Sequence, residues 1–169
     1  MSKSNLKEII KKVKLIILDV DGVLTDGSLY YYKDGEAFKK FNVRDGQGIK
    51  LAQAYGIEFA IISGRNCPIV SSRFLELGVN YIFQGCHDKS NKLKELSNEL
   101  KISLSEIAYI GDDILDVPPM EIVDLPVCPK DAHPSCFRVA KLVTETSGGS
   151  GCVRELIDLV LKEQGKIQI

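Results

Sequence analysis

The most chemically suggestive feature of the 169-residue sequence is a pair of carboxylates, Asp19 and Asp21, directly after the apolar run Leu15–Leu18. A short apolar run of this kind predicts a buried strand of a parallel sheet. Ionisable side chains at the carboxyl end of such a strand lie in the crevice where open α/β sheets bind ligands. The pair is therefore a candidate catalytic site, although an acidic turn that closes a strand is the plainer alternative.

Three further segments follow predicted strands, and each supplies a group that phosphoryl transfer needs. Ser63, with Gly64 and Arg65, offers a hydroxyl and a backbone amide that suit phosphate oxygens. Lys89 begins a predicted helix and can neutralise a phosphate as a point charge. The run 111–116 adds carboxylates of the kind that bind a hard cation such as Mg²⁺. Each segment alone is weak evidence, but four in order, each at the end of a strand, indicate a phosphoryl-transfer site.

The elements that must position these residues are βαβ units, because short β-rich runs alternate with longer runs of helical periodicity. The expected strands are Val13–Val20, Ile57–Ile62, Asn80–Phe83, Ile107–Ile110, Leu125–Cys128 and Lys141–Val143. The expected helices are Asp45–Tyr55, Cys67–Leu77, Lys89–Lys101, Ile114–Glu121 and Gly151–Gln164. This alternation predicts a parallel sheet.

One segment interrupts the alternation. Aromatic-rich runs at 28–32 and 36–41 flank Lys33-Asp34-Gly35, and an Asp-Gly pair is a strong hairpin signal. We expect a β-hairpin inserted at about residues 28–41, after the first strand. The sequence contains no internal repeat and no linker-like composition, so residues 1–169 are expected to form one domain.

The composition argues against several classes of function. With 22 Lys and Arg against 23 Asp and Glu, the net charge of −1 disfavours a nucleic-acid partner. The longest uninterrupted apolar runs have four residues, against about 20 needed to cross a bilayer. The basic segment 1–14 precedes no signal-peptide core, so a cytoplasmic location is expected. Five cysteines without a Cys-x-x-Cys pair suggest neither a disulfide framework nor a zinc site.

The four motifs together resemble those of the haloacid dehalogenase superfamily of phosphatases, from residue 13 to about residue 165. The matching positions are Asp19, Asp21, Gly22, Ser63, Lys89, Gly111, Asp112, Asp113 and Asp116. The resemblance implies an α/β fold with a doubly wound, Rossmann-like parallel sheet, helices on both faces, a small β-hairpin insert and no cap domain. It also implies a Mg²⁺-dependent phosphatase that works through an aspartyl-phosphate.

Within the superfamily, further stretches resemble the phosphatases of 3-deoxy-D-manno-octulosonate 8-phosphate, an eight-carbon keto-acid sugar phosphate. They are Asn42-Val43-Arg44-Asp45-Gly46, Ser63-Gly64-Arg65, Gln84-Gly85, Asp131-Ala132-His133-Pro134 and Glu163-Gln164-Gly165-Lys166. The resemblance thus implies that the substrate is this sugar phosphate and that the products are the free sugar acid and phosphate.

The resemblance also assigns roles at the reacting centre. Asp19 is expected to be the nucleophile, and Asp21 the general acid and then the general base. The expected ligands of Mg²⁺ are the side chains of Asp19 and Asp112 and the backbone carbonyl of Asp21. A cation is needed there because a carboxylate that approaches a phosphate dianion is otherwise repelled.

Other residues are expected to hold phosphate or substrate. Ser63 and Lys89 would contact the phosphoryl oxygens, while Asp113 and Asp116 would orient Lys89 or the waters on the metal. The resemblance places substrate contacts at Asp21, Asn42, Val43, Arg44, Asp45, Gly46, Lys50, Arg65, Arg73 and Lys89. Lys50 stands where the family tends to have arginine, which keeps the charge but loses the fork that binds a carboxylate in two places.

Assembly is expected to involve the hairpin, whose aromatic residues expose more apolar surface than a monomer favours. Similar proteins form four subunits in which a neighbour closes each active site. A homotetramer is therefore the expected state, with a sugar phosphate as the ligand and with neither nucleic acid nor membrane as a partner.

Two rival interpretations differ in substrate or in class. Phosphatases of nine-carbon keto-acid sugar phosphates are similar but tend to carry glutamate where Arg65 stands, so Arg65 favours the eight-carbon substrate. Receiver-type signalling modules also have an Asp, a Ser or Thr and a Lys on a doubly wound sheet. A receiver needs no acid beside its phosphorylated Asp, so Asp21 favours catalytic turnover. The intact motifs also argue against an inactive scaffold.

Overall fold

The core of the fold is a six-stranded parallel sheet in the order β5-β4-β1-β6-β7-β8. The computed structural model describes residues 3–168. The strands are β1 Leu15–Leu18, β4 Glu58–Ile62, β5 Tyr81–Phe83, β6 Ile107–Ile110, β7 Leu125–Cys128 and β8 Leu142–Val143. From β1 the chain adds β4 and then β5 toward one edge of the sheet. From β6 it adds β7 and then β8 toward the other edge, and every neighbouring pair of strands is parallel. This order is that of a doubly wound sheet, which confirms the expected fold class.

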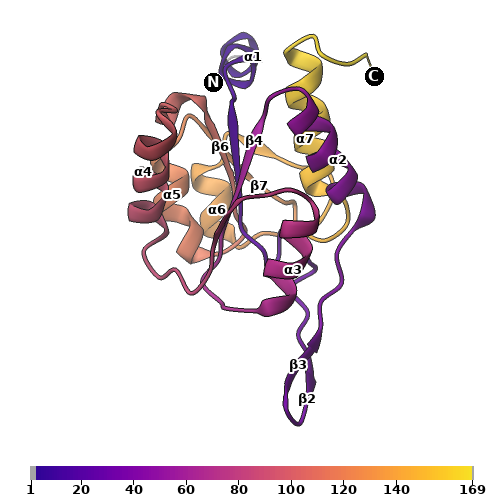
Figure 1. The fold of residues 1–169 in the computed structure, drawn as a ribbon. Helices are drawn as coiled ribbons and strands as arrows, with labels where there is room; N and C mark the ends of the chain where they lie inside the picture. Colours follow the sequence, from indigo (N-terminus) through magenta and orange to yellow (C-terminus); the bar gives the residue numbers. More distant parts are fainter. Residues whose placement is uncertain (1–2, 169) are drawn as a thin grey trace.

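Helices cover both faces of the sheet (Figure 1). They are α1 Lys3–Lys11, α2 Val43–Ala54, α3 Pro68–Glu76, α4 Lys89–Leu100, α5 Val117–Ile122, α6 Pro134–Val139 and α7 Cys152–Glu163, with short 3-10 helices η1 Leu104–Glu106 and η2 Ile114–Asp116. Ile16 and Leu18 of β1 pack into the core formed with α1, α2, α3 and α7. Leu15 and Ile17 point to the opposite face, into the core formed with α4, α5 and α6. The continuous apolar run of β1 is therefore buried on both sides.

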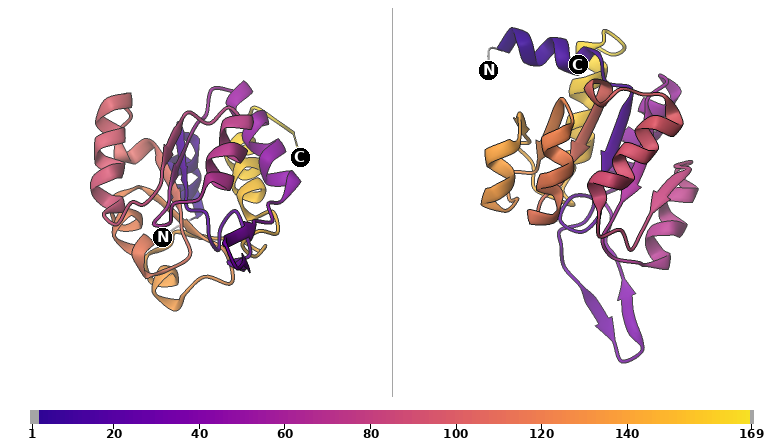
Figure 2. Two further views of the ribbon diagram at one scale, coloured as in Figure 1. Left: turned by 60° about the horizontal axis from the view of Figure 1, so that its bottom comes forward. Right: turned by 90° about the vertical axis from the view of Figure 1, so that its left-hand side faces the viewer.

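A β-hairpin of β2 (Tyr30–Tyr32) and β3 (Gly35–Phe38) projects away from the body of the molecule (Figures 1 and 2). Its strands are antiparallel, and the rings of Tyr30 and Phe38 stack with 4.3 Å between their centroids. Tyr31, Tyr32 and Phe38 nevertheless remain 63%, 75% and 54% exposed. The expected hairpin is confirmed, and within the described chain its aromatic surface is open.

Three helical features differ from the sequence-based expectation. The helices α1 and α6 were not predicted, although α1 buries Ile9 and Ile10 on one face and has the periodicity of an amphipathic helix. The uninterrupted helix expected over 114–121 is wrong, because η2 precedes a separate α5. Pro118 and Pro119 lack the N–H groups that a continuous helix would need, and they fit only in the first turn of α5.

None of the helices in residues 3–168 is long and apolar enough to span a lipid bilayer. The longest helices, such as α2 and α7, have 12 residues, whereas a membrane span takes about 20. Each of them also buries one face against the sheet, which is the arrangement of a globular α/β layer rather than of a lipid-facing helix.

A glycine turn before α7 packs against the loop that follows β1. The backbone N–H of Gly149 donates to the carbonyl of Val23 at 2.8 Å, and that of Gly148 donates to Asp131 Oδ1 at 2.9 Å. A Cβ atom on Gly148 would lie 1.9 Å from the carbonyl oxygen of Gly22. Since a backbone atom cannot move aside as a flexible side chain does, this approach requires glycine.

Replacing Gly148 tests this packing. We expect Gly148→Ala to lower the free energy of unfolding by about 1–3 kcal/mol, the usual cost of forcing extra volume into a packed site. Urea unfolding followed by circular dichroism measures the change. Gly64→Ala is the control, because its Cβ would meet only the Cys86 carbonyl at 3.9 Å and should cost no more than about 0.5 kcal/mol. Equal losses in both variants would contradict the packing argument.

Candidate active site

The carboxyl edge of the sheet carries a hollow of about 200 Å³ where the strand order reverses between β1 and β6. Asp19 follows β1, Ser63 follows β4, and Asp112 lies two residues after the end of β6. The hollow is lined by Asp19, Asp21, Ser63, Gly64, Arg65, Asp112, Asp113 and Leu115. Three of the segments predicted to act together thus meet at the place where doubly wound sheets bind ligands.

The fourth segment reaches the same place through Lys89, the first residue of α4. Asp88 caps this helix by accepting from the N–H of Asn91 at 2.9 Å. Lys89 Nζ donates to Asp19 Oδ1 at 2.8 Å and to Asp116 Oδ1 at 2.7 Å. Burial acts to lower the pKa of Lys89, but the negative charges of Asp19 and Asp116 outweigh it and raise the pKa above its usual value. Lys89 is therefore an ammonium ion, and it has a third proton to offer a ligand.

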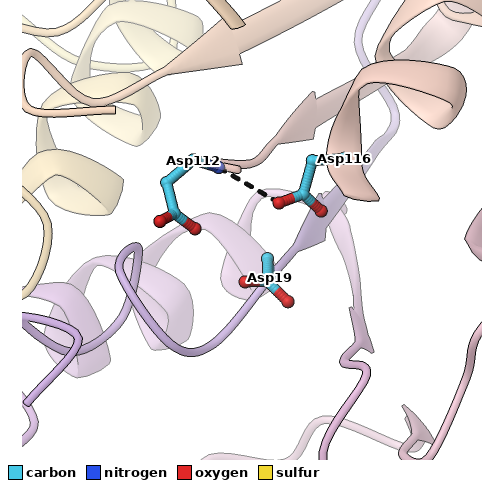
Figure 3. Close-up of side chains that lie close together, drawn as sticks. All are labelled: Asp19, Asp112 and Asp116. Carbon is cyan, nitrogen blue, oxygen red and sulfur yellow. Dashed lines mark hydrogen bonds between the residues drawn. The ribbon is translucent and has the colours of Figure 1, made fainter. Parts of the chain in front are cut away.

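Asp116 lies close to Asp19 and Asp112 (Figure 3), and both of its carboxylate oxygens accept hydrogen bonds. Its Oδ1 accepts from Lys89 and, at 2.7 Å, from the hydroxyl of the buried Tyr109. Its Oδ2 accepts from the backbone N–H groups of Asp112 and Asp113, each at 3.2 Å. Because both oxygens are engaged, Asp116 orients Lys89 and has no free oxygen with which to bind a metal. Its expected orienting role agrees with this geometry.

Asp19 and Asp112 have the geometry and charge of a cation site. Burial, followed by repulsion from Asp116, raises the pKa of Asp19 to about 7. Burial, followed by repulsion from Asp19, raises the pKa of Asp112 to about 8. Asp112 Oδ1 is buried without a hydrogen-bond partner, and a Cβ on Gly22 would lie 2.1 Å from Asp112 Oδ2. Two crowded carboxylates with an unused oxygen fit a hard divalent cation, whose charge would offset their repulsion.

Asp21 is held on two sides by cations. Its Oδ1 accepts from Lys39 Nζ, and its Oδ2 lies 3.7 Å from Arg65 Nε. The side chain of Lys39 is only 1% exposed, so this ion pair is shielded from water. Arg65 NH2 also donates to the hydroxyl of Tyr31 at 3.3 Å, which joins the hairpin to the loop after β4. Lys39 could not be singled out from the sequence, since a lysine followed by a second lysine carries no sign of which one is buried.

Ser63 and Asp113 contribute to the hollow in different ways. Ser63 is buried, and its backbone is fixed by 2.9 Å hydrogen bonds from its N–H to Phe83 and to its carbonyl from Cys86. Asp113 is exposed, and its Oδ1 accepts from the N–H of Ile114 at 2.7 Å at the start of η2. Asp113 thus caps a short helix at the rim, while Ser63 lies at the floor of the loop after β4.

Seven of the expected substrate contacts lie on or beside α2 and α3, outside this hollow. They are Asn42, Val43, Arg44, Asp45, Gly46, Lys50 and Arg73. Asn42 caps α2 by accepting from the N–H of Arg44 at 2.9 Å. Gly46 packs against Arg73, since its Cβ would lie 2.5 Å from the guanidinium. Val43, Arg44 and Lys50 are exposed on α2. The expected contacts found at the reacting centre are Asp21, Arg65 and Lys89.

Asp45 faces the N-terminus of α7. Its Oδ1 accepts from the N–H of Arg154 at 2.7 Å, and its Oδ2 is buried without a partner. Burial raises the pKa of Asp45 to about 6, against the lowering effect of the backbone hydrogen bonds from Arg154 and Val153. In this chain its carboxylate therefore joins α2 to α7, and its side chain is 1% exposed.

A larger hollow of about 880 Å³ lies at the opposite edge of the sheet, where it is lined by the segments that precede β1 and β4. Its carboxylates, Glu106 and Glu163, are paired with Lys14 at 2.6 Å and with Lys7 at 3.2 Å. Since these charges are already neutralised, this hollow lacks the cation-binding chemistry of the smaller one, and the candidate active site is at the carboxyl edge.

Comparison with known proteins agrees with the class that this fold and site define. A family model of haloacid dehalogenase-like hydrolases matches residues 81–156. The 3-deoxy-D-manno-octulosonate 8-phosphate phosphatase of Escherichia coli strain K12 is 46% identical over 157 residues, which cover 93% of this chain and 84% of that protein. The doubly wound sheet and its acidic carboxyl edge thus define a haloacid dehalogenase-like hydrolase.

Solved structures narrow the class further. The phosphatase of the same name from Yersinia pestis superposes with a TM-score of 0.93 at 41% identity, over 96% of this chain and 88% of that chain. The one from Moraxella catarrhalis, in complex with a magnesium ion, a phosphate ion and a KDO molecule, has a TM-score of 0.94 at 36% identity, over 97% and 94%. The chain belongs to the haloacid dehalogenase superfamily, in the phosphatase family that these relatives represent.

The raised pKa values of Asp19 and Asp112 predict that the affinity for Mg²⁺ and the stability of the metal-free protein both depend on pH. Both groups must lose their protons to bind Mg²⁺, so the Mg²⁺ affinity should rise by at least about tenfold between pH 6 and pH 8. Because the folded-state pKa values of about 7 and 8 lie above the ordinary carboxyl value, the metal-free protein should lose stability as the pH rises from about 4 to about 8. Calorimetric titration and thermal unfolding with and without Mg²⁺ measure the two effects.

Asp112→Asn is the control for this prediction. The variant keeps the side-chain size and lacks the charge, so it should bind Mg²⁺ weakly, and its affinity should rise less steeply over the same pH range because only Asp19 then has to lose a proton. A wild-type affinity that does not change with pH would show that the two carboxylates are already ionised before the metal binds.

Proposed function

We propose that the protein hydrolyses 3-deoxy-D-manno-octulosonate 8-phosphate to the free sugar acid and phosphate, as one hydrolase domain that uses Mg²⁺ and an aspartyl-phosphate intermediate. The observation that carries the proposal is the buried ammonium of Lys89, clamped between Asp19 and Asp116 at the carboxyl edge of the sheet. The names and the bound molecules of the relatives support the choice of substrate and metal.

The protein groups that would hold Mg²⁺ are the side chains of Asp19 and Asp112 and the backbone carbonyl of Asp21. Asp116 is left out because all its hydrogen-bonding capacity is used within the protein. When bound, Mg²⁺ supplies positive charge that screens the nucleophile from the phosphate and polarises the phosphoryl oxygens.

In the first step a carboxylate oxygen of Asp19 attacks phosphorus, and the bond from phosphorus to the sugar oxygen breaks. Two like charges about 4 Å apart repel by several kcal/mol at an effective dielectric near 20, so neutralisation is essential. Lys89 contributes to it by pointing its third N–H toward the phosphoryl group, while Ser63 offers a hydroxyl from the floor of the hollow. The product of the step is a phosphorylated Asp19.

Asp21 handles the protons of both steps. It lies two residues after the nucleophile and lines the same hollow. In the first step it gives a proton to the sugar oxygen, which would otherwise leave as a strongly basic alkoxide. In the second step it takes a proton from the water that attacks phosphorus and releases Asp19. The same carboxyl group thus starts each new cycle with the proton it gained in the previous one.

The position of Arg65 favours a substrate whose leaving group is an acidic sugar. It lines the hollow beside Asp21, and its side chain is 36% exposed, so a ligand in the hollow can reach it. A guanidinium suits the carboxylate of a keto-acid sugar, because its planar fork can bind both carboxylate oxygens. By the resemblance described above, enzymes for nine-carbon sugar phosphates tend to carry glutamate at this position, so Arg65 favours the eight-carbon substrate.

Phosphate release in the presence of Mg²⁺ tests the reaction and its two carboxylates. Asp19→Asn should abolish turnover, with the fold retained by circular dichroism, because an amide is not a nucleophile here. Asp21→Asn should slow turnover of the sugar phosphate by about 10²–10⁴-fold, since proton transfer is lost. A wild type that preferred the nine-carbon sugar phosphate by more than tenfold would refute the proposed substrate.

Two features support assembly into a tetramer whose active sites are closed by neighbouring subunits. They are the exposed hairpin and the expected substrate contacts on or beside α2 and α3 that lie outside the hollow. Tyr31, Tyr32 and Phe38 are exposed aromatic side chains of the hairpin, which a second copy of the chain can cover. The expected substrate contacts Arg44 and Arg73 do not line this chain's own hollow. In an assembly the exposed Arg44 is available to the sugar end of a substrate bound by a neighbour, and Arg73 would have to exchange its ion pair with Glu76 for such a contact.

A charge on the hairpin tests the assembly. Tyr32→Glu places a carboxylate in the most exposed part of the aromatic surface, so it should shift the wild-type tetramer to smaller species in light scattering, with at least about tenfold lower activity. Tyr55→Glu, at a 42% exposed position after α2, is the matched control and should remain tetrameric. Full activity in dissociated Tyr32→Glu would exclude closure of the site by a neighbour.

A further inference from the structure

Lys39 connects the hairpin to the candidate general acid. It directly follows β3, and its Nζ donates to Asp21 Oδ1 while only 1% of its side chain is exposed. The next residue, Lys40, is by contrast 66% exposed and pairs with Asp26 at 3.5 Å. Lysines are almost never buried this completely unless they are paired. The ion pair with Asp21 is therefore part of the packed structure at the base of the hairpin.

The two oxygens of the Asp21 carboxyl group have different surroundings. Oδ1 faces the ammonium of Lys39, whereas Oδ2 lies 3.7 Å from Arg65 Nε in the loop after β4. Asp21 and Arg65 both line the hollow that contains Asp19. Because an ammonium can only donate hydrogen bonds, Oδ1 has to act as an acceptor. Any proton that Asp21 gives or receives must therefore reside on Oδ2.

We propose that Lys39 is a positioning residue for Asp21, which holds Oδ1 so that Oδ2 alone exchanges protons with the reacting atoms. The inference rests on the proposed function, in which Asp21 is the general acid and base. In the first step the Asp19–phosphorus bond forms, the phosphorus–sugar oxygen bond breaks, and the proton of Oδ2 passes to the sugar oxygen. In the second step a water oxygen bonds to phosphorus, Asp19 leaves, and a water proton returns to Oδ2.

The role of Lys39 has a kinetic signature that a general loss of structure would not produce. Without the ammonium, the carboxyl group of Asp21 is free to rotate, and its proton can sit on either oxygen. The loss matters only when the leaving group needs a proton, as an alkoxide does. A p-nitrophenolate leaves without one. The ratio of kcat/KM between the two kinds of substrate therefore reports on the position of Asp21.

Lys39→Met tests the proposal, because it keeps the length of the side chain and removes its charge and its donors. We expect kcat/KM for the eight-carbon sugar phosphate to fall at least about tenfold, and kcat/KM for p-nitrophenyl phosphate to change less than about threefold. Lys39→Arg restores a donor and should recover part of the loss. Lys40→Met is the matched control from the exposed neighbour and should leave both values unchanged.

A double-mutant cycle with Asp21→Asn shows whether Lys39 acts through Asp21. Added to Asp21→Asn, Lys39→Met should lower kcat/KM for the sugar phosphate no further, since the group it positions is already inactive. An equal loss for both substrates in Lys39→Met alone would overturn the proposal. A full additional loss in the Asp21→Asn background would overturn it as well.

A series of phenyl phosphates whose phenols differ in acidity separates this proposal from the choice of substrate. The dependence of kcat/KM on phenol acidity should be steeper in Lys39→Met than in the wild type. If the wild type fails to hydrolyse the sugar phosphate while the dependence still steepens, the proposed substrate fails and the role of Lys39 stands. An unchanged dependence in an enzyme that does hydrolyse the sugar phosphate overturns the role of Lys39 alone.

Discussion

The site depends on the crowding of like charges at the carboxyl edge of the sheet. Asp19, Asp112 and Asp116 place oxygens within 4.8 Å of one another in a largely buried space. Such a cluster is unfavourable unless each negative charge is balanced by cations or hydrogen-bond donors, and the surrounding structure balances the three carboxylates unequally. Asp116 is satisfied by Lys89, Tyr109 and two backbone N–H groups. Asp19 has to share the ammonium of Lys89 with Asp116, and Asp112 Oδ1 has no hydrogen-bond partner, and this imbalance creates the demand for a cation.

Backbone packing keeps this crowded arrangement rigid. Gly22 approaches the Asp112 carboxylate, and Gly148 approaches the carbonyl of Gly22, each closer than a residue with a Cβ would allow. The loop after β1 is thereby confined between the loop after β6 and the turn before α7. Because positions of catalytic groups must hold to a fraction of an ångström, such confinement serves the chemistry as well as stability.

The sequence was sufficient to predict the parallel sheet and the meeting of Asp19, Ser63, Lys89 and Asp112, because strand ends in an α/β alternation converge on one edge. The roles of Lys39 and Asp45 could not be predicted in the same way. Burial of one lysine in a pair depends on where the hairpin rejoins the body, and the contact of Asp45 with Arg154 joins residues 109 positions apart. Local patterns carry no information on such distant contacts.

A count of the buried and half-buried charges shows what the hairpin contributes to the site. Asp19, Asp21, Asp112 and Asp116 face the three cations Lys39, Arg65 and Lys89, which leaves one net negative charge. A divalent cation would turn this into one net positive charge, which attracts a phosphate dianion. Because Asp21 holds a proton when the phosphate group binds, the loaded site stays positive even without Lys39, so the charge of Lys39 matters for the placement of Asp21 more than for the attraction of the dianion. The hairpin therefore brings to the active site the cation that holds Asp21.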